Sequence, residues 1–346
     1  MGLAEEIHRL VTRPVRLMEV CGGHTRAIRQ FGIPSLLPEC LSLLSGPGCP
    51  VCVTSRQYID QAIALADEAI ICSYGDLMRV PGSASSLEQA KASGKDIRLV
   101  YSSLEALKTA ITNPGRKVVF LGIGFETTAP ATAAAIIRAA KLRVNNFSVL
   151  SAHKVMPPAM EAIVDAGVQI DGYICPGHVS AIAGTQMYTP MVDHYGLGCV
   201  VSGFEPLDIL QSLLMLARQV INGKPKVEIQ YTRAVKAGGN PIALAVMNEV
   251  FETEDTWWRG LGVIKDSGLR NRADYKIFDA SRVFSLPGSD LPEPEGCICG
   301  DILKGISIPN RCRLFGKKCT PENPVGACMV SPEGTCQTYY HYEGKH

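Results

Sequence analysis

The sequence predicts an α/β fold: two parallel-sheet domains that face a cleft, followed by a small irregular C-terminal module. Three observations predict it. With 346 residues and 46% hydrophobic composition, the chain is longer than one compact core usually organises. Short apolar runs alternate with helical patterns between residues 15 and 222, as in parallel sheets that are covered by helices. After residue 262, prolines, glycines and six cysteines replace that alternation.

Each expected strand is a short apolar run that ends in turn residues, and each expected helix has apolar residues three and four positions apart. Strands are expected at 15–20, 41–45, 69–73, 97–100, 118–122, 147–150, 172–175 and 199–202. The clearest helical patterns cover 57–66, 104–111, 131–141 and 207–221.

The sequence Asn-Pro-Gly at 113–115 breaks regular structure and predicts a junction between domains. We therefore expect Rossmann-like α/β domains over residues 1–114 and 115–262, and a cysteine-rich module over 263–346. The module has too few apolar residues to hold its shape by burial, so covalent or metal cross-links are the expected substitute.

Composition and charge argue against several classes of function. The 34 basic and 33 acidic residues leave a net charge of +1 without a basic run, which argues against nucleic-acid binding. The N-terminus does not resemble a signal peptide, and no apolar run has membrane-spanning length, so a cytoplasmic protein is expected. In that reducing compartment, 13 cysteines favour metal or redox chemistry over structural disulfides.

Four unusual turns follow predicted strands. The motif CGGHT covers residues 21–25, GPGCPVC covers 46–52, GFETT covers 124–128 and PGHVS covers 176–180. Open α/β sheets bind ligands at the carboxyl ends of their strands, where all four turns are expected. The turns are therefore expected to converge on one cleft.

The first two turns carry a possible redox or metal centre. Cys49 and Cys52 form a C-x-x-C pair before a helix expected to start near Ser55, whose dipole favours a thiolate. A redox-active dithiol is the favoured interpretation, with half of a zinc site or two buried thiols as alternatives. Together with Cys21 and His24, the pair has the composition of a structural zinc site, or of a transient iron or copper centre.

The other two turns offer proton-transfer groups. Glu126 is expected to act as a proton carrier or a partner-docking group, whereas Thr127 or Thr128 is expected to cap the following helix. His178 is as compatible with a structural role as with a functional one. The G-I-G sequence at 122–124 is not a dinucleotide-binding motif, because the third glycine and the ribose-binding carboxylate are missing.

The remaining cysteines fall into two groups. Four lie singly in apolar surroundings and are expected to be buried thiols: Cys40, Cys72, Cys175 and Cys199. Six lie close together in the C-terminal module: Cys297, Cys299, Cys312, Cys319, Cys328 and Cys336. The nearest histidine to them is His341, so they predict a four-thiolate site for zinc or an iron-sulfur cluster, with two cysteines left over.

Taken in order, the four motifs and the six-cysteine tail closely resemble the HypD family of [NiFe]-hydrogenase maturation factors. The resemblance includes MEVCGGHT at 18–25, GFETTAP at 124–130 and the other two motifs, and it spans nearly the whole chain. It implies a scaffold that, with the chaperone HypC, assembles the Fe(CN)2CO group of the hydrogenase active site. Cyanide would arrive from HypE, which works with HypF, and the product would pass to the hydrogenase large subunit.

The resemblance also implies roles for individual residues. Cys21, with His24 beside it, would bind the iron shared with HypC, and the redox dithiol would be Cys49 and Cys52. A [4Fe-4S] cluster would be held by four tail cysteines: Cys297, Cys312, Cys319 and Cys336. A second dithiol would remain: Cys299 and Cys328.

Arg26 stands where many relatives have a second histidine, so no histidine role is expected at that position. The resemblance leaves open whether such a scaffold, whose product leaves by transfer to a partner, is an enzyme. Two other functions also stay open. One is a stand-alone thiol-disulfide oxidoreductase with an iron-sulfur electron donor, and the other is a zinc-stabilised interaction protein.

Overall fold

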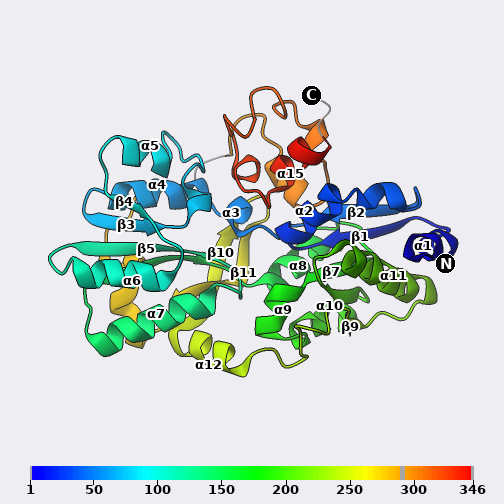
Figure 1. The fold of residues 1–346 in the computed structure, drawn as a ribbon, viewed down its shortest axis with the longest axis horizontal. Coiled ribbons are helices and arrows are strands. Elements are labelled where there is room, and N and C mark those ends of the chain that lie inside the picture. Colours follow the sequence, from blue (N-terminus) through cyan, green and yellow to red (C-terminus); the bar gives the residue numbers. More distant parts are fainter. Residues whose placement is uncertain (1, 289–292, 344–346) are drawn as a thin grey trace.

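Two parallel sheets dominate the computed structural model, which describes residues 2–288 and 293–343. The sheets lie end to end along the longest axis, and the C-terminal segment lies over the junction between them (Figure 1). The α/β class with parallel sheets is therefore confirmed.

All eight expected strands are present, within a few residues of their expected bounds. They are β1 (Val15–Glu19), β2 (Leu41–Ser45), β3 (Ala69–Ser73), β4 (Ile97–Leu99), β5 (Lys117–Gly124), β6 (Phe147–His153), β7 (Gly172–Pro176) and β8 (Gly198–Ser202). The structure adds β9 (Val227–Ile229) and an antiparallel hairpin of β10 (Phe251–Trp258) and β11 (Gly262–Asn271). Sequence reasoning missed these strands because β9 is very short and charged, half-exposed residues interrupt the hairpin.

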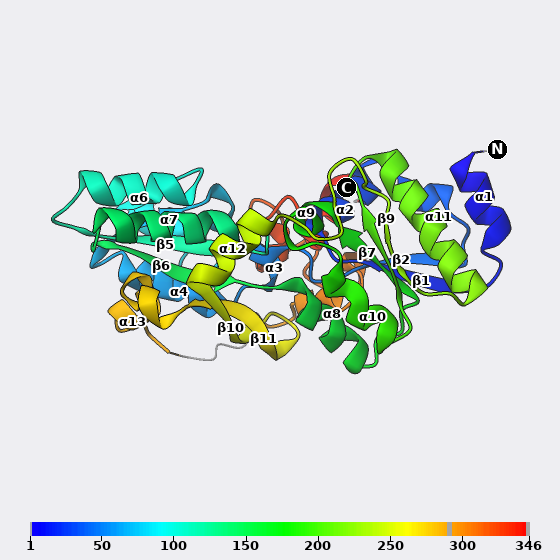
Figure 2. The same ribbon diagram turned by 90° about the horizontal axis from the view of Figure 1, so that it is seen from below.

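Helices connect the strands, and the four clearest helical patterns correspond to α4, α6, α7 and α11. The helices are α1 (Leu3–Leu10), α2 (Gly22–Gln30), α3 (Pro50–Val53), α4 (Arg56–Leu65), α5 (Leu87–Ala92), α6 (Ser103–Thr112), α7 (Ala129–Leu142), α8 (Met156–Asp165), α9 (Gly177–Ala183), α10 (Thr189–Asp193), α11 (Pro206–Asn222), α12 (Pro241–Val250), α13 (Ala280–Val283), α14 (Cys299–Leu303) and α15 (Thr335–Tyr342). They cover both faces of each sheet: α6 and α7 lie opposite α4, and α11 lies opposite α8 and α10 (Figure 2). None of the helices in the described ranges is long and apolar enough to cross a membrane.

The strand order corrects the expected division into domains. The first sheet has the order β2-β1-β7-β8-β9, and the second has the order β4-β3-β5-β6. The chain therefore starts the first sheet, crosses over to build the whole of the second, and returns. A boundary at residue 114 is wrong, because residues 113–115 only turn from α6 into β5 within the second sheet. The boundary at residue 262 falls at the turn of the β10-β11 hairpin.

The pairing of β1 explains why the chain returns to the first sheet. This strand is largely buried, and a buried strand needs hydrogen-bonding partners along both edges. On one edge β1 pairs with β2, with Glu19 beside Ser45, and on the other with β7, with Leu17 beside Gly172. The turns after β1, β2 and β7 therefore come from one sheet and meet the turn after β5, which comes from the other.

From residue 293 on, the described chain is irregular, although the expected module from residue 263 also includes most of β11. Residues 293–343, the C-terminal segment, contain α14, α15, short 3-10 turns such as Ala327–Met329, and no strand. It packs on the helices that carry the first two motifs: α15 lies against α2, and the 3-10 turn Ala327–Met329 lies against α3. The cysteine-rich tail is thereby joined to the motif turns.

Candidate functional site

Cys21 lies in the turn between β1 and α2. Its backbone is extended, with φ −151° and ψ 123°, and its N–H donates to Glu19 Oε2 at 3.1 Å. The side chain is buried, and its Sγ lies 4.0 Å from His178 Nδ1. Burial raises the pKa of the Cys21 thiol well above its usual value, and the negative charge of Glu333 adds to this effect.

Glu19 is a buried carboxyl beside this cysteine that sequence reasoning missed. Its Oε1 accepts a hydrogen bond of 2.5 Å from Thr25 Oγ1, while Oε2 accepts from the Cys21 backbone. Burial raises the pKa of Glu19 to about 8. The available signal was its position: an acidic residue at the end of an apolar strand is costly unless it is paired.

His24 is held away from solvent by the loop after β8. Its Nε2 donates to the carbonyl of Gly203 at 2.9 Å, and its ring stacks on Phe204 with centroids 4.6 Å apart. This leaves Nδ1 buried without a hydrogen-bond partner. Burial lowers the pKa of His24 to about 4, so the ring is neutral at neutral pH.

His178 sits in the first turn of α9, next to Phe204. The two rings lie 5.1 Å apart, and burial lowers the pKa of His178 to about 4. Phe204 therefore contacts both neutral histidines. Sequence reasoning missed it because it lies in a loop without a chemical motif.

The Cys49 and Cys52 side chains form a disulfide at the start of α3. The Cys49 Sγ also accepts the Cys52 N–H at 3.3 Å. The preceding Gly48 packs on the Cys21 turn so closely that an added Cβ would lie 2.1 Å from the Cys21 nitrogen. Gly22 N–H donates to the Gly48 carbonyl at 3.1 Å, which fixes the disulfide turn to the Cys21 turn.

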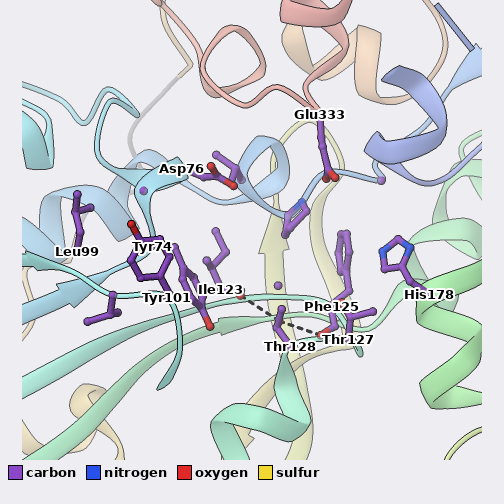
Figure 3. A pocket seen from close by; sticks show the side chains of 16 residues that line it. Tyr74, Asp76, Leu99, Tyr101, Ile123, Phe125, Thr127, Thr128, His178 and Glu333 are labelled. Atoms are coloured by element: carbon purple, nitrogen blue, oxygen red, sulfur yellow. Dashed lines mark hydrogen bonds between the residues drawn. The ribbon is translucent and has the colours of Figure 1, made fainter. Parts of the chain in front are cut away.

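A pocket of about 550 Å³ opens beside these two turns, at the expected meeting of the two sheets (Figure 3). His178, Phe125 and Thr127 lie at one end, and Tyr74, Leu99 and Tyr101 at the other. Asp76 and Glu333 both reach the pocket, and Glu333 comes from the C-terminal segment. Its wall thus combines both sheets and the tail.

Glu126 is absent from the lining of this pocket. Its Oε1 accepts the Met156 N–H at 2.9 Å, and its buried Oε2 has no partner. Burial raises the pKa of Glu126 to about 7. Thr128 stands at the N-cap position of α7 but does not cap it: its hydroxyl donates to the Ile123 and Phe125 carbonyls.

The six tail cysteines line a single small cavity of about 20 Å³. Apolar side chains complete the lining: Ile302, Leu314, Phe315 and Met329. Two of the thiols form a close pair, with the Sγ atoms of Cys299 and Cys328 3.0 Å apart. A donor set of six sulfur atoms without carboxylates, four of them from buried cysteines, fits an iron-sulfur cluster or zinc.

No three or more His, Cys, Asp and Glu side chains in residues 2–288 and 293–343 are already arranged to hold a metal ion. This includes the zinc combination considered for the first two turns, because Cys49 and Cys52 bond to each other and His24 bonds to a backbone carbonyl.

The remaining predicted residues are structural or peripheral. Cys72, Cys175 and Cys199 are buried, as expected, whereas Cys40 is only half-buried and its thiol donates to the Val11 carbonyl at 3.1 Å. Arg26 is exposed on α2. The pKa of the pocket residue Glu333 is raised by burial and by Asp76, and the charge of Arg26 opposes that rise.

Comparison with known proteins places nearly the whole chain in one family. Residues 1–343 match the HypD family, described as the hydrogenase formation hypA family. The hydrogenase maturation factor HypD of Cupriavidus necator is 50% identical over 337 residues, which cover 94% of this chain and 89% of the relative. HypD of Rhodobacter capsulatus is 47% identical over 350 residues, covering 99% and 93%. HypD of Azotobacter vinelandii is 49% identical over 340 residues, covering 95% and 90%. The chain therefore belongs to the HypD family.

Proposed function

We propose that this chain is a cytoplasmic scaffold for maturation of [NiFe] hydrogenase. With HypC it would assemble Fe(CN)2CO, accept cyanide from HypE working with HypF, and pass the product toward the hydrogenase large subunit. Family membership supports the role in maturation. The carrying observation is that a buried cysteine, a neutral histidine and a disulfide meet beside one pocket between two sheets.

Cys21 would be the thiolate ligand of the iron during assembly. Carbon monoxide and cyanide bind an electron-rich iron, and a thiolate donates electron density to it. Because burial raises the pKa of the Cys21 thiol, the free protein carries the proton at neutral pH. Iron would displace that proton as a metal displaces protons from cysteine ligands generally. The neutral His178 ring, with Nδ1 4.0 Å from Sγ, would orient the thiol.

Cys49 and Cys52 would supply electrons for cyanide release. Cleavage of the S–C bond of a thiocyanate gives a thiolate and cyanide, and it consumes two electrons. Two thiols that become a disulfide release two electrons and two protons, which balances this step. The disulfide of the structure is the spent form in this scheme, and its contact with the Cys21 turn supports the assignment.

The tail would restore the dithiol. The convergence of all six tail thiols on one cavity supports a [4Fe-4S] cluster on Cys297, Cys312, Cys319 and Cys336. When bound, this cluster would supply single electrons. The close pair of Cys299 and Cys328 would collect two of them and pass them on by thiol-disulfide exchange.

Infrared spectroscopy of the complex with HypC, purified without oxygen, tests the central assignment. Cys21→Ala is expected to abolish the cyanide and carbon monoxide bands, because the iron loses its ligand on this chain. Cys40→Ala is the matched control, since it removes a half-buried thiol that lies outside the site. Unchanged bands in the Cys21 variant would overturn the assignment.

A second function, a stand-alone thiol-disulfide oxidoreductase, is favoured only by the disulfide next to the pocket. It predicts that the purified chain reduces a generic protein disulfide with turnover in the absence of HypC. Loss of that turnover in Cys49→Ser would support this function, whereas the scaffold predicts no turnover beyond stoichiometric exchange.

A further inference from the structure

The tip of the β10-β11 hairpin lies between three parts of the molecule that carry cysteines or motifs. The hairpin belongs to neither parallel sheet and crosses between them behind α3 (Figure 1). Its tip follows Trp258, whose ring stacks on Phe125 of the GFETT turn with centroids 5.9 Å apart. On the same ring lies Lys154 Nζ, 5.2 Å from the centroid. The tip is therefore anchored to the second sheet.

Arg259 joins this tip to the disulfide helix α3. Its backbone N–H donates to the Val53 carbonyl at 2.9 Å, and its guanidinium NH2 donates to the Thr54 carbonyl at 2.9 Å. These are the last residue of α3 and the residue that ends it. Because α3 is a single turn that begins directly after Cys49, two bonds at its end fix the position of the whole disulfide segment.

The same side chain also joins the tip to the tail. The guanidinium NH1 forms an ion pair with Glu293, just before the first tail cysteine. The next residue, Gly260, has φ +80° and packs so closely on Gly300 that an added Cβ would lie 2.4 Å from the Gly300 Cα. Gly300 directly follows Cys299. Arg259 thus contacts α3, and Arg259 and Gly260 together contact the tail segment that carries Cys299.

The burial of Arg259 makes this junction stiff. Only 1% of its side chain is exposed, and its Nε has no hydrogen-bond partner. Burial of a guanidinium is costly unless its charge is paired. Its planar fork serves Glu293 and the Thr54 carbonyl at the same time, whereas the single ammonium of a lysine cannot reproduce that geometry. If α3 separated from the tail, the guanidinium would either become exposed to solvent or stay buried without its charge partner.

We propose that Arg259 is a positioning residue that holds the Cys49–Cys52 disulfide against the Cys299 and Cys328 thiols for exchange. This inference rests on the proposed function, because it assumes that the tail reduces the disulfide. In the exchange, one tail thiolate attacks a sulfur of the disulfide, and the second tail thiol resolves the mixed disulfide. Two electrons and two protons pass to Cys49 and Cys52, and a Cys299–Cys328 disulfide remains.

The test measures the rate of this exchange in the full chain. The protein is reduced briefly with dithiothreitol, quenched with acid at intervals and alkylated, and mass spectrometry reads the redox state of each cysteine pair. Arg259→Gln is expected to slow the exchange that moves the disulfide from Cys49–Cys52 to Cys299–Cys328 by at least about tenfold. Glu293→Gln, at a half-exposed partner that is easier to replace, is expected to slow it less. Arg270→Gln is the control, since this hairpin arginine pairs with Glu252 near the surface.

A double-mutant comparison separates positioning from general damage. With Cys299→Ser the tail route is closed, so Arg259→Gln is expected to have no further effect on the slow direct reduction of Cys49–Cys52. An equal loss in both backgrounds, or no loss in Arg259→Gln and Glu293→Gln, overturns the role of Arg259 alone. If Cys299→Ser itself leaves the reduction of Cys49–Cys52 unchanged, the tail is not the electron source, and the proposed relay fails together with this inference.

Discussion

Replacement of Gly48 by alanine tests whether the disulfide turn and the Cys21 turn form one rigid unit. The added Cβ would lie 2.1 Å from the Cys21 nitrogen, 2.3 Å from its Cα and 2.3 Å from the Val20 carbonyl carbon. All three are backbone atoms, and none can rotate away as the end of a side chain would. Since ordinary contacts lie beyond about 3.4 Å, the two turns must separate by roughly 1 Å.

Both stability and iron binding should respond to this separation. Overpacking of a tight site typically costs about 1–3 kcal/mol, and weakening of the bond from Gly22 N–H to the Gly48 carbonyl adds about 1 kcal/mol. We therefore expect the free energy of unfolding, measured by urea titration, to fall by about 2–4 kcal/mol. The infrared bands of Fe(CN)2CO on the HypC complex should weaken or disappear.

The matched control is Gly115→Ala. An added Cβ there meets nothing within 4 Å, and the residue lies in a surface turn far along the chain. It should leave both measurements unchanged. Wild-type urea stability and full infrared bands in Gly48→Ala would refute the idea that the two turns must touch.

Two further predictions concern the buried carboxyl and the tail. Burial raises the pKa of Glu126 from 4.5 to about 7, so its stabilising contribution is complete below pH 4.5 and is lost as the pH rises to 7, in total about 3 kcal/mol. Between pH 5 and pH 8 the wild type should lose about 3 kcal/mol more of its free energy of unfolding, measured by urea titration, than Glu126→Gln does. An equal loss in both proteins would contradict the assigned environment of Glu126. In the tail, anaerobically purified chain should contain about four irons, which Cys312→Ser or Cys336→Ser removes and Cys40→Ser retains. Stoichiometric zinc without iron in the wild type would contradict the assignment of an iron-sulfur cluster.

The sequence was most informative about strands and the turns that follow them. The eight strands were predicted because buried parallel strands are nearly continuous apolar runs, such as 69–73 and 172–175. The convergence of Cys21, Cys49 and His178 followed from the rule that such turns share the carboxyl edge. Sheet membership was not predictable in the same way, because the pairing of β1 with β7 joins residues whose separation leaves no local signal.

The missed residues of the site share one property. Glu19, Phe204 and Arg259 act through tertiary contacts: a carboxyl that caps a turn, a ring that contacts two histidines, and a guanidinium between segments. Their neighbours in sequence do not reveal those partners. Glu126 shows the opposite limit, since its motif is conspicuous but its side chain is buried against Met156 instead of lining the pocket.

The return of the chain to its first sheet also has a consequence for biosynthesis. All four strands of the second sheet lie between residues 69 and 153, so this sheet is complete once that stretch has left the ribosome. The first sheet has only β1 and β2 until β7 and β8 follow, and the loop whose Phe204 ring stacks on His24 comes later still. During that interval the nascent chain displays Cys21, Cys49 and Cys52 without their cover. Until then these thiols depend on a reducing environment to avoid wrong pairs, so anaerobic expression favours the native protein.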